Sequence, residues 1–147
     1  MATMQPSRTP WHLWVFGVLS LLWNCYGGYD YVMSETNPAG YLADAGYGLE
    51  VVAWVQSFPA WEVGLWAIGV WGSVLGSLLL LMRSRFAATA FLVSLLGALG
   101  SFAYQLTSNP PAAATGTIEI VMHAVIVIVI ILQWYYAKRQ TAAGVLK

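Results

Sequence analysis

Residues 61–106 decide the fold, and they read WEVGLWAIGVWGSVLGSLLLLMRSRFAATAFLVSLLGALGSFAYQL. Two apolar runs, 61–82 and 86–106, stand on either side of Arg83 and Arg85. Each run has the length of about 20 residues that a helix needs to cross about 30 Å of hydrocarbon. Because the connection between them is so short, the stretch predicts two antiparallel membrane-spanning helices.

Two further apolar runs flank this hairpin, at about 11–31 and about 117–137. Arg8 before the first run also fits a secretory signal peptide. The first run is rich in tryptophan, however, and no small-residue cleavage motif follows it, so we interpret it as a retained helix. The sequence therefore predicts an all-α polytopic membrane protein, a single domain of residues 1–147 with four transmembrane helices in an antiparallel bundle.

The composition excludes several other classes of protein. Of 147 residues, 59% are hydrophobic and only 8% charged, against about 25% charged in soluble domains. A soluble or disordered chain does not fit these values. The formal net charge of zero provides no field for binding nucleic acid. The single cysteine, Cys25, excludes a disulfide or a paired-cysteine metal site within one chain.

Positive and negative residues occupy different connections between the predicted spans. The cations lie before the first span, between the second and third, and after the fourth: Arg8, Arg83, Arg85, Lys138, Arg139 and Lys147. By the positive-inside rule, both termini face the cytoplasm. The carboxylates lie in or beside the two outer connections: Asp30, Glu35, Asp44, Glu50, Glu62 and Glu119.

The outer connections carry their own local signals. In the outer loop 32–60, apolar residues recur at helical spacing from Leu42 to Gln56, which predicts one short helix in the membrane interface. The connection 107–116 contains Asn109-Pro110-Pro111 and predicts an extended loop.

Small residues form a stripe on each helix of the central hairpin, where they allow close backbone approach. They are Gly69, Gly72, Ser73 and Gly76 on one helix and Ser94, Gly97 and Ser101 on the other. Packing of the hairpin is the first interpretation of these stripes. A homodimer interface is the alternative.

Polar residues lie on the same helix faces, mostly toward the outer side. They predict a polar cluster of Asn24, Glu62, Gln105, Glu119 and His123 in the outer half of the bundle. Ionisable residues within a span are costly and are candidates for function. The alternative is that Glu62 and Glu119 serve only the positive ends of their helix dipoles and stay wet, with His123 bonded to Glu119.

The sequence contains few residues suited to catalysis or to cofactor binding. A metal needs three or four ligands, and Glu119 and His123 supply only two. His12 and His123 lie at opposite sides of the membrane, so they cannot be paired haem ligands. Without a nucleophile or a cofactor motif, an acid–base enzyme using Glu119 and His123 is the weakest hypothesis, and we expect no catalysis, metal or cofactor.

Many tryptophans and tyrosines stand at the predicted span ends, which is typical of an interfacial aromatic belt. Aromatic rings near carboxylates also suit a sugar or an amphipathic ligand. Tyr41, Tyr47 and Trp54 of the outer loop are the candidates for that second role.

Over about its first two thirds, the chain resembles a family of small four-helix inner-membrane proteins of proteobacteria, often labelled sugar transporters. The resemblance is carried by Trp11-His12-Leu13-Trp14, Leu22-Trp23-Asn24, Gly27, Asp30-Tyr31, Ser57-Phe58-Pro59-Ala60-Trp61, Gly69-Val70-Trp71-Gly72 and the run 76–85. It implies a location in the bacterial inner membrane and transport of sugar, but it brings no catalytic or binding residue with it.

Two functions follow as hypotheses. The first is a permease for a small polar solute, such as a sugar, acting in the lipid bilayer as a homo-oligomer, because four helices rarely enclose a complete pathway. The second is a non-catalytic accessory or assembly subunit that binds a partner in a larger membrane complex.

Overall fold

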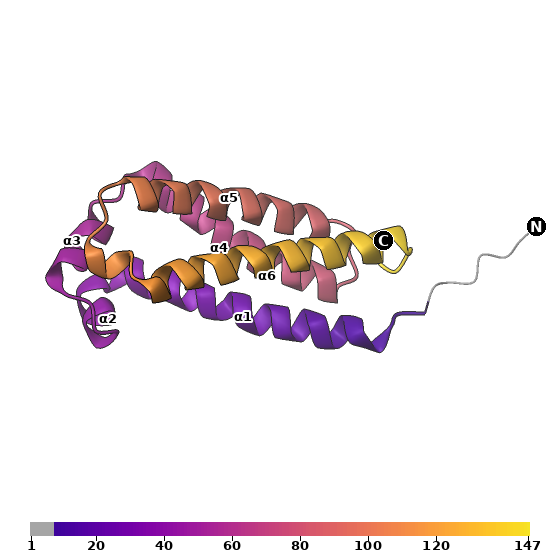
Figure 1. The fold of residues 1–147 in the computed structure, drawn as a ribbon. Helices are drawn as coiled ribbons and strands as arrows, with labels where there is room; N and C mark the ends of the chain where they lie inside the picture. Colours follow the sequence, from indigo (N-terminus) through magenta and orange to yellow (C-terminus); the bar gives the residue numbers. More distant parts are fainter. Residues whose placement is uncertain (1–7) are drawn as a thin grey trace, which may run out of the picture.

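The computed structural model describes residues 8–147, and its regular structure there is entirely helical (Figure 1). The predicted all-α class is therefore confirmed for this part of the chain. The helices are α1 (Trp11–Thr36), α2 (Pro38–Asp44), α3 (Leu49–Gln56), α4 (Ala60–Leu81), α5 (Ala87–Thr107), the 3₁₀ turn η1 (Ala112–Ala114) and α6 (Thr117–Ala142).

Three helical stretches in the described residues are long and apolar enough to cross a membrane: Ala60–Leu81, Ala87–Thr107 and Ala112–Ala142. They suggest a membrane protein. The predicted first span lies within α1, which has 26 residues but does not reach the apolar character of the other three. The sequence shows why, because the C-terminal half of α1 contains Asn24, Asp30 and several tyrosines and glycines.

Helices α4 and α5 form the predicted antiparallel hairpin, with Arg83 in the left-handed region of the turn at φ 58°. Small residues bring the two backbones together. A Cβ atom placed on Gly69 would lie 3.1 Å from the amide nitrogen of Ala98, and one on Gly72 would lie 3.0 Å from the Cβ of Ser94. The hydroxyl of Ser94 donates a hydrogen bond to the carbonyl of Gly69 across this contact.

The other small residues of the two stripes contact different neighbours. Gly76 faces the ring of Phe91, and Gly97 faces the backbone of Gly69. Ser73 directs its carbonyl toward α1. Ser101 contacts Glu62.

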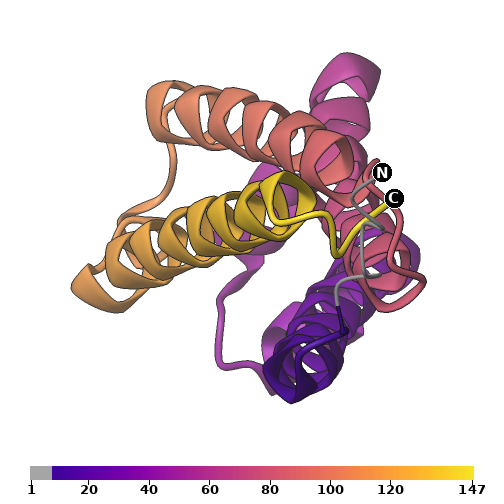
Figure 2. The same cartoon turned by 90° about the vertical axis from the view of Figure 1, so that its right-hand side faces the viewer.

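Helices α1 and α6 lie closer together at the end that carries the C-terminus and diverge toward the other end (Figure 2). At the near end, the rings of Phe16 and Tyr136 stack with their centroids 4.1 Å apart, and His12 bonds the Tyr136 hydroxyl at 2.5 Å. At the far end, the two helices line opposite walls of a cavity.

The outer segment 32–60 differs from the prediction, because two short helices replace the single one expected from Leu42 to Gln56. The chain breaks between α2 and α3 at Gly46, whose φ of 89° is left-handed and favours glycine. A small satellite core forms here, in which Leu42, Val51 and Val52 are buried together. The connection expected to be extended includes the turn η1, which packs against this core through Ala114.

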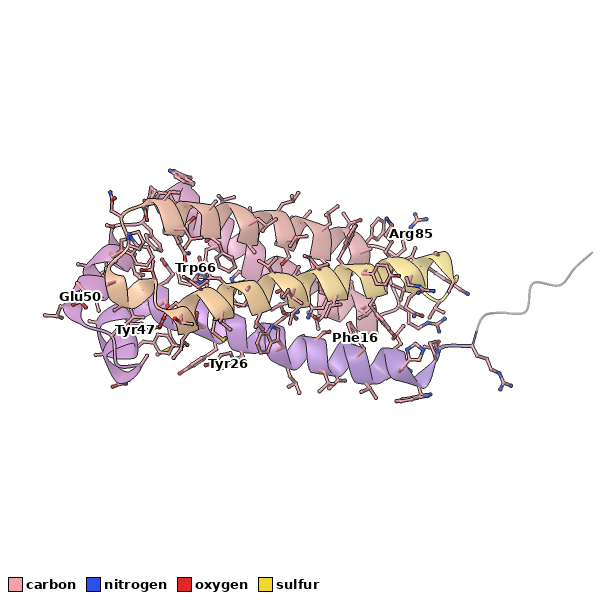
Figure 3. The ribbon with its side chains drawn as sticks, in the orientation of Figure 1. Phe16, Tyr26, Tyr47, Glu50, Trp66 and Arg85 are labelled. Carbon is pink, nitrogen blue, oxygen red and sulfur yellow. The ribbon has the colours of Figure 1, made fainter. Side chains whose placement is uncertain are left out.

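Opposite charges lie at opposite ends of the structure. Arg85 lies at one end and Glu50 at the other (Figure 3). The C-terminus is fixed at the Arg85 end, because Lys147 donates its backbone NH to the Arg83 carbonyl at 2.9 Å and its carbonyl accepts from the Arg85 NH at 3.0 Å. Val145 and Leu146 are buried beside this pairing.

Candidate functional site

A cavity of about 420 Å³ lies among α1, α3, α4, α5 and α6, in the half of the molecule where α1 and α6 diverge. Figure 3 shows Tyr26, Tyr47 and Trp66 in this half. Its walls are mainly aromatic and aliphatic. The aromatic lining residues are Trp23, Tyr26, Tyr47, Trp54, Phe58, Trp66 and Phe102.

A second cavity, of about 180 Å³, continues from the first beneath the outer helices. Both cavities are lined by Tyr47, Trp54 and Trp66. The second one also touches Leu42 and Val51 of the satellite core. The outer segment therefore covers the large cavity at the acidic end of the molecule.

Four of the five residues of the predicted polar cluster line the large cavity: Asn24, Gln105, Glu119 and His123. Glu62 does not line it, and its side chain is 0% exposed. The structure divides the five residues into two separate hydrogen-bonded groups, described next, because α1 and α6 hold Asn24 and His123 at different depths.

The first group joins α4, α5 and α6 around Glu62. The Ser101 hydroxyl donates to Glu62 Oε1 at 2.7 Å, and Gln105 Nε2 donates to the same oxygen at 3.1 Å. Gln105 Nε2 also reaches Ser101 Oγ at 3.0 Å. The second carboxyl oxygen of Glu62 is buried and has no hydrogen-bond partner in the structure. The alternative of a wet helix-end carboxylate therefore does not describe Glu62.

His123 continues this group toward the cavity. Its Nε2 lies 3.4 Å from Gln105 Oε1, and its Nδ1 lies 2.7 Å from the backbone carbonyl of Glu119. The ring meets Phe102 edge-on, with the centroids 4.1 Å apart.

The expected bond between His123 and Glu119 is present, but it reaches the Glu119 backbone carbonyl and not the side chain. A helical side chain points back along its own helix, so the imidazole meets the carbonyl four residues earlier. The Glu119 carboxylate instead accepts a hydrogen bond from the Tyr47 hydroxyl at 3.0 Å.

The second group surrounds Asn24, deeper between the helices. Asn24 Nδ2 lies 3.0 Å from the Ser73 carbonyl, 2.9 Å from Ser77 Oγ and 3.3 Å from Gln133 Oε1. Gln133 is buried, and its Nε2 has no hydrogen-bond partner in the structure. Asn24 lines the cavity, whereas its partners Ser77 and Gln133 lie outside the lining. Ser77 and Gln133 were not among the predicted site residues, although Ser77 follows Ser73 by one helical turn.

The cavities are negative in character. Asp30 and Glu119 contribute to both linings, whereas none of the described lining residues is lysine or arginine. Burial, and then the hydrogen bond to Glu119, raise the pKa of Tyr47 above its ordinary value. Burial, and then the 2.7 Å bond from its hydroxyl to Asp30, likewise raise the pKa of Tyr41.

Of the three aromatic candidates in the outer loop, Tyr47 and Trp54 line the large cavity and Tyr41 does not. Trp54 is oriented by a hydrogen bond from its indole nitrogen to Ser108 at 3.1 Å. Trp23, Trp66 and Phe102 lie within predicted spans. Only the packing of different helices reveals that they line the same space.

Within residues 8–147, no group of three or more His, Cys, Asp or Glu side chains is arranged to hold a metal ion. His12 contacts Tyr136 at the basic end, far along the bundle from His123. Comparison of the chain with protein-family models, with curated proteins and with solved structures found no match.

Proposed function

We propose that this protein is a four-helix inner-membrane permease that binds a small solute in the 420 Å³ cavity. In this proposal α1 is the fourth span, both termini are cytoplasmic, and the cavity opens toward the outer side. The cavity carries the proposal, because its volume lies within the range of about 300–1,000 Å³ typical of ligand sites. Its aromatic walls and few polar groups also match such sites.

The lining restricts the chemistry of the solute. Asp30 and Glu119 would repel an anion, and no lysine or arginine among the described lining residues would offset them. The solute is therefore neutral or cationic. A monosaccharide fits this description, because a sugar offers an apolar ring face to Trp54 or Trp66 and hydroxyls to Gln105 and His123. The resemblance to proteins labelled as sugar transporters supports the same class.

A pathway needs more than the observed cavity. The Asn24 group and the stack of Phe16 on Tyr136 close the bundle toward the basic end. Only 6% of the most apolar window of α6 is buried. We infer that a second copy packs against α6 and that the solute crosses when the α1–α6 contact opens.

Tryptophan fluorescence of the purified full-length chain in lipid nanodiscs tests the proposal. The probes are a panel of monosaccharides, with tetramethylammonium as the cation and sulfate as the anion. We expect one class of neutral or cationic solute to change the emission saturably. Trp66→Phe should abolish most of the change, whereas Trp11→Phe, whose ring lies at the opposite end and is 75% exposed, should preserve it.

Uptake of the binding solute into proteoliposomes completes the test. Binding without uptake would refute the permease and leave a binding protein. Saturable binding of sulfate alone would refute the assignment of the solute class. No response to any probe in the panel would remove the support for the cavity as a solute site.

The exposed face of α6 also favours the second candidate, an accessory subunit of a larger membrane complex. A transmembrane partner would bury this face in the same way as a second copy. Mild detergent extraction of the tagged chain from its native membrane distinguishes the two. A stoichiometric partner of different sequence supports the accessory role, and a pure homo-oligomer counts against it.

A further inference from the structure

Three ionisable or amide side chains from three helices form one line into the bundle. His123 of α6 lines the cavity, Gln105 of α5 lies behind it, and Glu62 of α4 is fully buried at the end. The hydrogen-bonding capacity of these groups restricts where protons can lie.

Both ring nitrogens of His123 face groups that only accept. A backbone carbonyl has no hydrogen to donate, so the 2.7 Å contact to Glu119 requires a proton on Nδ1. Gln105 Oε1 is also only an acceptor, so the 3.4 Å contact requires a proton on Nε2. This arrangement therefore holds an imidazolium at His123. In this arrangement we assign the transferable proton to His123, and Glu62 is the ionised group whose Oε1 accepts from Ser101 and Gln105.

A second arrangement uses the same atoms with one proton moved. If the Gln105 amide turns by half a rotation, its nitrogen donates to an unprotonated His123 Nε2 and its oxygen faces Glu62. Glu62 Oε1 then carries a proton and donates it to that oxygen. One N–H bond at His123 breaks, one O–H bond at Glu62 forms, and the opposite charges of the two side chains disappear together.

The surroundings favour neither arrangement completely. The buried second oxygen of Glu62, which has no hydrogen-bond partner in the structure, makes an ionised carboxylate costly. The carboxylates of Glu119 and Asp30 line the same cavity as His123. Tyr47, bonded to Glu119, is the other titratable group that faces this point. The remaining neighbours, Ser101 and Phe102 of α5, are uncharged.

We propose that Glu62, Gln105 and His123 form a proton-binding site that exchanges protons with the cavity. This inference rests on the proposed function: the proton is the ion whose movement is coupled to the movement of the solute. His123 exchanges protons with the cavity, and Glu62 stores one behind it. The orientation of the Gln105 amide, which also lines the solute cavity, depends on where the proton lies.

Infrared difference spectroscopy of the full-length chain in nanodiscs tests the site without any solute. The pH is stepped between about 5 and 8, the range in which an imidazole changes charge and an ordinary carboxyl stays ionised. Both arrangements hold the same transferable proton, so a rise in pH acts by removing that proton to the cavity, which leaves His123 neutral and Glu62 ionised. We therefore expect the carbonyl stretch of the protonated carboxylic acid to weaken as the pH rises across this range. Glu62→Gln should eliminate the change.

Glu119→Gln is the matched control, because Glu62 and Glu119 are each the third residue of their helices. It should retain the carboxylic acid signal. His123→Asn removes the group that favours the ionised carboxylate. In that variant, we expect the signal of the protonated acid to persist to the alkaline end of the range.

Absence of the signal from the natural chain, or its survival in Glu62→Gln, would overturn the proton site. If Glu62→Gln does not fold, an unaltered signal in His123→Asn overturns it equally. Solute binding without this signal would leave the proposed function intact and refute the coupling. The signal without any solute response would retain the proton site and refute the permease assignment.

Discussion

Replacement of Gly97 by alanine tests whether the contact between α4 and α5 holds the protein together. A Cβ atom at Gly97 would lie 2.8 Å from the Gly69 amide nitrogen, 2.8 Å from Ile68 Cγ2 and 2.9 Å from the Leu65 carbonyl oxygen. Two of these three atoms belong to the backbone of α4, which cannot rotate away. The helices must therefore separate until the contacts approach about 3.5–4.0 Å.

The expected cost follows from two opposing terms. Overpacking of a close contact costs about 1–3 kcal/mol, and separation of the helices also weakens the neighbouring bond from Ser94 to Gly69. Alanine returns up to about 1 kcal/mol through its better helix propensity. We expect Gly97→Ala to lower the free energy of unfolding by up to about 2 kcal/mol, the overpacking cost less that gain.

Reversible unfolding in mixed micelles with increasing dodecyl sulfate, followed by circular dichroism, measures this loss. Gly64→Ala is the matched control, because a Cβ at Gly64 of α4 would have no atom within 4 Å. That variant should be as stable as the natural chain or slightly more so. Equal stability of Gly97→Ala and Gly64→Ala would refute the argument that this close backbone contact stabilises the hairpin.

Three further predictions concern other parts of the structure. Asn24→Leu removes the donor shared by three acceptors and deprives Gln133 Oε1 of its contact. The same unfolding assay should therefore show a loss of about 1–2 kcal/mol in the free energy of unfolding. Unchanged stability would contradict a stabilising role for the Asn24 group. In an alkaline ultraviolet titration, Tyr47 should ionise above the ordinary tyrosine range because burial and then Glu119 raise its pKa, and Tyr47→Phe should remove that late step. Since the folded pKa exceeds the unfolded one, this stabilisation is present below about pH 10 and disappears as the pH rises through the folded value; a titration unaltered by Tyr47→Phe would refute it. Deletion of 145–147 removes two buried apolar side chains and should cost about 3–6 kcal/mol. Lys147→Ala retains the backbone pairing and should leave the stability unchanged; equal stability of the deletion and that control would contradict the prediction.

Local composition was enough to predict the hairpin and the helical class. The runs on both sides of Arg83 and Arg85 are each apolar over the length of a span, whatever the rest of the chain does. The same local spacing predicts one helix between Leu42 and Gln56 where the structure has two. The helix is interrupted because the left-handed backbone of Gly46 ends the regular spacing there.

The candidate site was only partly predictable. Glu62 and Glu119 occupy the same position in their helices, and the sequence treats them alike. In the structure, Glu62 is enclosed by Ser101 and Gln105, while Glu119 remains half-buried and binds Tyr47. Helical spacing predicts which residues share a face, but it does not determine which residue of another helix lies opposite.

The sequence by itself determined the helices, because long apolar segments in lipid must satisfy their backbone groups internally. It also determined the separation of positive and negative charge between the connections. Tertiary structure alone decided that Asn24 and His123 belong to different hydrogen-bonded groups and that Trp23, Trp54 and Trp66 line the same cavity. The physical reason is distance, since a hydrogen bond operates over about 3 Å. Whether two side chains on different helices come that close depends on how the helices cross and how far each is shifted along its axis. The close contact of Gly69 with Gly97 fixes the relative position of α4 and α5, and thereby brings Glu62 to Gln105.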